Sequence, residues 1–184
     1  MSTFETIKSR RSIRKYSTRK IEDEKLNKIL EAGRLAPSWQ NKQCWRFIVI
    51  QNKKTINKLA LKSGFISKAN FFIKDAPVVI VLCGNPQNSG KMNGQNYYLV
   101  DTAIAFQQMM LVAWEMGIGS CWLGAFNEEK VKLILSIPQE IKVVALSPFG
   151  YPAKKDSLYA KAVKIFAGSN NRKKLETIVH NEMW

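Results

Sequence analysis

Three arginines, one lysine and two serines lie within the eight residues RRSIRKYS, from Arg10 to Ser17. Guanidinium groups can form paired hydrogen bonds with phosphate, so this stretch could bind an anionic ligand. It could equally be a solvated basic turn, because Lys and Arg number 29 against 14 acidic residues and the formal net charge is +15. Such a charge attracts nucleic acids, anionic membranes and phosphorylated cofactors alike.

A second polar cluster lies in LAPSWQNKQCWRF, between a predicted helix and a predicted strand. Its amide and hydroxyl side chains are those of Ser38, Gln40, Asn41 and Gln43. Such neutral groups suit the hydrogen-bonding edge of a planar heterocycle, and Trp39 and Trp45 add apolar faces beside them. The same polar groups could instead satisfy the backbone of an ordinary helix-to-strand turn. From the residues alone, the two interpretations are evenly balanced.

The other motifs fail as signatures of known chemistry. GIGSCWLG has Trp122 where a dinucleotide-binding fingerprint needs its third glycine, and GNPQNSGKM has one residue too many for a phosphate-binding P-loop. His180 is the only histidine, and the chain has no G-x-S-x-G motif of a serine hydrolase. The cysteines Cys44, Cys83 and Cys121 are too far apart for a C-x-x-C site. An enzyme without an acid–base cluster is expected to take its reactivity from a bound cofactor.

Hydrophobic patterns predict a single α/β domain over residues 1–184, with a central sheet between helices. Helices are expected over residues 4–10, 21–37, 53–63, 67–76, 97–117 and 128–137, and strands over 44–52, 76–86, 120–126 and 141–152. The strand at 76–86 is continuously apolar, which is typical of a strand covered on both faces. The helix at 97–117 is apolar nearly all round, so it belongs in a core or an oligomer interface. The last 30 or so residues carry apolar patches with little periodicity, which suggests an arm that reaches onto another subunit.

Taken in order, the motifs resemble those of the nitroreductase family of flavin-dependent oxidoreductases, in its compact members. They are RRSIRKY, LAPSWQNKQCWRF, the long apolar helix, GSCWLGAF and ALSPFGYPA, and the similarity covers essentially the whole chain. The resemblance implies a three-layer α+β sandwich with a central, mostly antiparallel mixed sheet. It also implies FMN as cofactor and an obligate homodimer with two sites at the interface, in which the C-terminal arm is exchanged with the partner.

The resemblance also implies roles for individual residues. Arg10, Arg11, Ser12 and Arg14 match the motif that contacts the FMN phosphate, ribityl chain and pyrimidine edge. Pro37, Ser38, Trp39, Asn41 and Gln43 match the motif that reaches the flavin bound mainly by the other subunit. Gly124 and Ala125 match the place where backbone N–H groups approach flavin N5 and O4. Arg172 and Lys173 match a late basic position that closes over the phosphate, and Asn70 is a weaker match to an amide near the flavin.

The implied activity is the reduction of nitroaromatics, quinones or similar electron-poor acceptors with NADH or NADPH, by a ping-pong mechanism. No catalytic side chain and no metal are expected, because the flavin carries the chemistry. Neither nucleic acid nor a membrane is expected as a partner. The start MSTFETIKSRR lacks the apolar run of a signal peptide, so a cytoplasmic location is expected.

Two alternatives stay open. One is a basic nucleic-acid-binding module without enzymatic activity, which would use Trp39, Trp45 and Tyr16 as stacking platforms. The other is a flavin-binding protein of the same fold with a non-reductase role.

Cys44 stands where many relatives have proline, and its thiol is interpreted as an inert buried group or an oxidisable one near the flavin. The basic segment after Pro152 adds Lys154 and Lys161 as further candidates for phosphate contacts.

Overall fold

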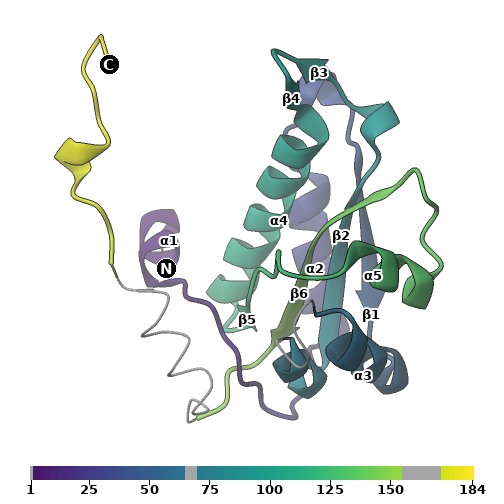
Figure 1. The fold of residues 1–184 in the computed structure, drawn as a ribbon. Coiled ribbons are helices and arrows are strands. Elements are labelled where there is room, and N and C mark those ends of the chain that lie inside the picture. The colour runs from purple at the N-terminus through teal and green to yellow at the C-terminus, as the bar shows by residue number, and fades with distance from the viewer. Residues whose placement is uncertain (1, 65–69, 155–170) are drawn as a thin grey trace.

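The computed structural model describes residues 2–64, 70–154 and 171–184 of the 184-residue chain. Within these residues four antiparallel strands form one sheet in the order β1-β2-β6-β5 (Figure 1). The strands are β1 (Trp45–Ile50), β2 (Val78–Gly84), β6 (Lys142–Gly150) and β5 (Gly119–Ser120). Two short strands, β3 (Lys91–Met92) and β4 (Gln95–Asn96), pair separately as a hairpin.

Helices cover both faces of the sheet, as the three-layer prediction requires. They are α1 (Thr3–Ser9), α2 (Asp23–Arg34), α3 (Lys53–Lys62), α4 (Tyr97–Glu115) and α5 (Glu128–Leu135). Short 3₁₀ turns lie at η1 (Trp39–Asn41), η2 (Phe71–Asp75), η3 (Pro86–Asn88) and η4 (Leu175–Thr177). Figure 1 shows α2 and α4 running together over one face, while α3 and α5 lie over the other.

Strand β2 supplies both layers of the core. Its side chains alternate between the two faces of the sheet, as they must in a strand. Val78, Ile80 and Leu82 pack with α2 and α4, whereas Val79 and Val81 pack with α3, η2 and α5. All seven residues of the strand are buried, which confirms the prediction that it is covered on both faces.

The long helix α4 also agrees with the prediction, and its end has a clear cause. Gly117 takes a left-handed conformation with a φ of 76° directly after the C-cap Met116, a conformation that glycine adopts without steric penalty. One side of α4 lies in the core, but Leu99, Val100 and Ile104 remain exposed. The helix therefore presents apolar surface that the described residues do not cover.

Two predicted elements were too long. The strand expected at 120–126 is reduced to β5, followed by a single bridge from Leu123 to Leu146. The exposed Gly124 and Ala125 come next in an irregular loop and form no strand ladder with β6. Of the helix expected at 67–76, residues 67–69 lie outside the described part of the chain, and the rest is the 3₁₀ turn η2. Pro77 directly follows it and disfavours a helical conformation in the residue before it.

The backbone of β5 and the segment before Arg14 pack against each other without a gap. A Cβ added to Gly119 would lie 2.8 Å from the Cβ of Ile13, which has no freedom to move away. We therefore expect Gly119→Ala to lower the free energy of unfolding by about 1–3 kcal/mol, measured by urea denaturation. At Gly124 an added Cβ meets only the Trp122 ring nitrogen at 3.7 Å. A Gly124→Ala variant destabilised as strongly as Gly119→Ala would contradict this explanation.

No helix in the described part of the chain combines the length and the apolar character needed to cross a membrane.

Candidate functional site

The basic motif near the chain start is fixed to one end of the sheet. The Ile13 N–H donates to the carbonyl of Ser120 at 2.9 Å, and Ser12 forms a parallel bridge with the same residue. The buried Tyr16 hydroxyl donates back to the Ile13 carbonyl and ties the segment to itself. These bonds hold the Arg10–Arg14 backbone beside β5.

The three arginines of this motif have no carboxylate partner among the described residues. The ion pairs found there use other cations, Arg19 and Arg34 among them. Burial raises the pKa of the Cys121 thiol, while the charges of Arg14 and Arg10 and a hydrogen bond with Ser12 act to lower it. The positive charge is thus felt at the start of the loop after β5. This donor set fits the phosphate of the implied FMN, which guanidinium groups bind well.

The loop after β5, which begins next to this motif, presents free backbone donors. Gly124 and Ala125 are both exposed, and neither N–H donates a hydrogen bond to another described residue. The Ala125 carbonyl accepts a 3.0 Å hydrogen bond from the side-chain amide of Asn70, which is only 4% exposed. Asn70 therefore fixes the orientation of this peptide. Free N–H groups on a fixed loop are what a flavin N5 and O4 edge would need.

The Asn70 contact leads to a stability prediction. Asn70→Ala is expected to lower the free energy of unfolding by about 1–2 kcal/mol, because the partly buried Ala125 carbonyl loses its donor. Asn70→Asp should be more damaging at neutral pH, since it places a carboxylate against that carbonyl. Urea denaturation measures both effects, with Asn57→Ala on the exposed side of α3 as control. If the aspartate variant is as stable as the parent, the contact does not hold the loop.

The loop 37–43 has an unusual backbone. Gln40, Asn41 and Gln43 adopt left-handed conformations, with φ angles of 48°, 54° and 49°. Residues other than glycine rarely adopt such angles, and those that do tend to lie at functional sites. Internal bonds maintain the shape: the Gln43 N–H donates to the Ser38 hydroxyl at 2.9 Å. The side chains of Asn41 and Gln43 are exposed and hydrogen-bonded to each other at 3.0 Å.

Trp39 is packed within its own chain. Its ring lies against Gly90, where an added Cβ would come within 2.6 Å of the ring carbons, and 5.8 Å from the ring of Tyr97. The ring therefore supports the β3–β4 hairpin, and the predicted contact of Trp39 with a cofactor remains a prediction. Pro37 lies next to it on the exposed side of the loop.

The structure does not bring the two predicted motifs together in one chain. The loop 37–43 bonds to Asp101 and packs on Tyr97, near the start of α4. The basic motif bonds to Ser120, just beyond the end of α4. A helix of 19 residues is about 28 Å long, so the two groups lie near opposite ends of α4. Arg172 and Lys173 are exposed on the C-terminal segment, which lies apart from the sheet and helices (Figure 1).

Sequence reasoning missed one residue of this region, Asp101. It is buried on α4 and its carboxylate accepts the Trp39 N–H at 2.9 Å. The available signal was the single acid in the mostly apolar stretch from Tyr97 to Trp114. Nothing in the sequence showed which residue it contacts.

The nucleic-acid alternative loses its stacking surfaces in the structure. Trp45 and Tyr16 are buried, with 6% of each exposed, and the ring of Trp39 packs against Gly90 and Tyr97.

The three thiols are free and buried, and burial is the main cause of their raised pKa values, about 11 for Cys44 and about 12 for Cys83. They are therefore protonated at neutral pH and poor nucleophiles. Among the described residues no cluster of His, Cys, Asp and Glu could hold a metal ion.

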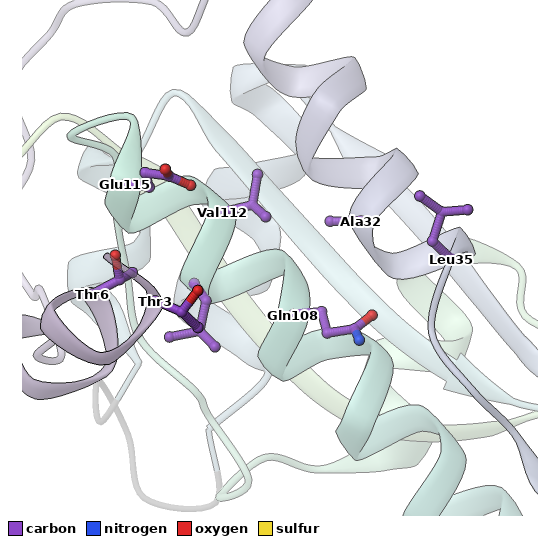
Figure 2. A pocket seen from close by; sticks show the side chains of 8 residues that line it. Thr3, Thr6, Ala32, Leu35, Gln108, Val112 and Glu115 are labelled. Carbon is purple, nitrogen blue, oxygen red and sulfur yellow. The ribbon is translucent and has the colours of Figure 1, made fainter. Parts of the chain in front are cut away.

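A separate groove of about 360 Å³ lies between α1, α2 and α4 (Figure 2). Its lining is Thr3, Thr6, Ala32, Leu35, Gln108, Leu111, Val112 and Glu115. None of the predicted site residues is among them. The groove continues the incompletely covered surface of α4 and does not mark the candidate cofactor site.

Comparisons with known proteins agree with the fold and the motifs. The model of the Nitroreductase family matches residues 7–64 and 65–151. A protein of Archaeoglobus fulgidus, which its name proposes to be an NADH dehydrogenase/NAD(P)H nitroreductase, is 36% identical over 83% of this chain and 87% of its own. A solved nitroreductase family protein of Clostridium difficile 630 is 35% identical, with a TM-score of 0.82 and 100% of both chains covered.

A further solved structure is that of a protein described as FMN-dependent. The FMN-dependent nitroreductase of Clostridium difficile R20291 is 28% identical, with a TM-score of 0.76, and the match covers 97% of this chain and 98% of that one. The fold of these proteins is the three-layer arrangement found here. The family model covers most of the chain, and several relatives match it over nearly their full length. The chain therefore belongs to the nitroreductase family.

Proposed function

We propose that this protein is an FMN-dependent oxidoreductase that uses NADH or NADPH to reduce electron-poor acceptors such as nitroaromatics and quinones. One observation carries the proposal. Arg10, Arg11 and Arg14 have no carboxylate partner among the described residues, and their backbone is fixed on Ser120, just before the loop that carries the free N–H groups of Gly124 and Ala125. The names of the relatives, which include an FMN-dependent nitroreductase, support the same cofactor.

The chain's own residues have distinct tasks in this proposal. Arg10, Arg11, Ser12 and Arg14 would hold the phosphate, ribityl chain and pyrimidine edge of FMN, and Arg172 and Lys173 would close over the phosphate. The N–H groups of Gly124 and Ala125 would orient the ring through its N5 and O4 atoms, with Asn70 fixing their loop. When bound, FMN supplies the hydride and electron transfer. This division of labour explains why the sequence offers no acid–base cluster.

The active form is proposed to be a homodimer with two cofactor sites, each built from residues of both subunits. Loop 37–43 lies at the opposite end of α4 from the arginines, so the loop of one copy would complete the site of the other. The exposed apolar residues of α4 offer a surface for that association. Leu175, Ile178 and Val179 on the C-terminal segment are also exposed, as expected for an arm that is exchanged with the partner.

The electron donor and the acceptor are proposed to occupy the same site in turn, which is ping-pong behaviour. The net charge of +15 would help attract pyridine nucleotides, whose phosphates are anionic. The buried free thiols of the described residues suit a reducing, cytoplasmic compartment.

The direct test is the visible absorption spectrum of the natively purified protein, followed by anaerobic titration with NADH and with NADPH. A yellow protein whose flavin absorbance is bleached by either nucleotide, and restored by a quinone or a nitroaromatic, supports the proposal. Initial rates at several fixed acceptor concentrations should then give parallel double-reciprocal lines. A colourless protein that does not bind added FMN would refute the cofactor. A flavin that neither nucleotide reduces would favour the non-reductase alternative.

A further inference from the structure

Asp101 is a buried carboxylate that joins three separate segments of the chain. It lies on α4 with 2% of its surface exposed. One oxygen, Oδ1, accepts the backbone N–H of Trp39 at 2.9 Å. The other oxygen, Oδ2, accepts the hydroxyl of Ser89 at 3.2 Å and the thiol of Cys44 at 3.6 Å. The stretch from Trp39 to Cys44 and the segment before the β3–β4 hairpin therefore meet α4 at one side chain.

A carboxylate is an expensive residue at such a position. No lysine or arginine among the described residues forms an ion pair with Asp101, so its hydrogen bonds alone compensate its burial. The Cys44 thiol is suited to donate one of them, because burial and the Asp101 charge raise its pKa to about 11. Packing alone would be satisfied by an apolar residue, as at most other buried positions of α4.

The loop that Asp101 holds needs such a contact. Three of the four residues from Gln40 to Gln43 are in the left-handed region. Strained conformations persist only where the surroundings determine them fully. Inside the loop, Ser38 fixes Gln43, but the loop is anchored to the helix through the Trp39 N–H. Removing Asp101 would leave this partly buried donor without its acceptor and the loop free to relax.

We propose that Asp101 is a positioning residue, which sets the shape of loop 37–43 so that the loop can complete the cofactor site of a second copy. The inference rests on the proposed function, in which that loop contacts FMN. Asp101 itself touches no cofactor in this scheme. It acts through the Trp39 N–H, and through Ser89 it also fixes the segment that leads into the β3–β4 hairpin.

The test compares Asp101→Ala, Asp101→Asn and the parent chain. The control is Lys132→Met, which removes another buried charge, 2% exposed and paired with Glu128 at 3.3 Å in the opposite layer. FMN affinity is measured by quenching of flavin fluorescence. Amide hydrogen exchange of residues 38–43 is measured in the FMN-free protein, and this second readout does not depend on the cofactor.

Asp101→Ala is expected to weaken FMN binding about tenfold and to speed exchange at Trp39. Asp101→Asn keeps an oxygen for the Trp39 N–H, so it should stay within about threefold of the parent. Lys132→Met should lower the melting temperature without changing FMN affinity or loop exchange.

Three outcomes would contradict the inference. It is overturned if Asp101→Ala leaves FMN affinity and loop exchange unchanged, if Lys132→Met weakens FMN binding equally, or if Asp101→Ala no longer folds. The last result would make Asp101 a residue of the core and not of the loop. A parent chain that binds no FMN refutes the proposed function instead. In that case faster exchange at Trp39 in Asp101→Ala still shows that the carboxylate holds the loop, but its role at a cofactor site falls with the function.

Discussion

An Arg10→Ala/Arg14→Ala double variant is expected to bind FMN about a hundredfold more weakly than the parent chain. Both side chains are partly buried, belong to a backbone fixed on Ser120, and have no carboxylate partner among the described residues. Cations of this kind are already positioned for an anion, so their hydrogen bonds to a phosphate are made without breaking an existing ion pair. The loss should be large because each bond involves two charged groups.

The measurement is FMN titration by fluorescence quenching at two salt concentrations. Arg19→Ala/Arg34→Ala is the matched control, since it removes the same charge from arginines that already pair with Glu22 and Glu31. If general attraction by the positive surface were the whole effect, both double variants would weaken binding equally, and salt would abolish the difference from the parent. A specific contact predicts a large defect in the first variant alone. Equal affinities in all three proteins would exclude the basic motif from the cofactor site.

The sequence predicted the fold well where one physical signal dominated. The apolar run at 76–86 was predicted to be a strand covered on both faces, and β2 is such a strand. The helix expected at 128–137 begins at Glu128 as α5, where the side chain of the N-cap residue Asn127 accepts the Lys130 N–H at 2.9 Å. These signals are local, because the residues that carry them are neighbours in the chain.

The parts that failed depend on contacts between distant segments. Residues 120–126 have strand-like composition, but β5 pairs with β6 only at Gly119 and Ser120, and this limit cannot be read from composition. Asp101 contacts Trp39, which is 62 residues away in the sequence. The resemblance identified the candidate motifs, but only the structure shows that α4 separates them. This separation is the physical reason to expect two chains at each site.

A Val100→Asp/Ile104→Asp double variant is therefore expected to be monomeric and to lose FMN binding by more than about two orders of magnitude. Both residues lie one helical turn apart on α4, are about 40% exposed, and belong to the apolar surface that the chain does not cover itself. Two carboxylates on this surface would have to lose their hydration on association without any cation to compensate them. In a monomer the arginines and loop 37–43 remain near opposite ends of α4, so the site could not be completed.

Light scattering coupled to size-exclusion chromatography measures the mass, and fluorescence quenching measures FMN affinity on the same samples. The control is Leu61→Asp/Leu133→Asp, which adds the same charge at two leucines of α3 and α5 that are even more exposed. This control should remain a dimer and bind FMN as the parent does. A monomeric α4 variant that retains the parent's FMN affinity would contradict the composite site, because all binding groups would then belong to one chain. A variant that stays dimeric would exclude this face of α4 from the interface, since two unpaired carboxylates cannot be buried there without a large loss of affinity between the subunits.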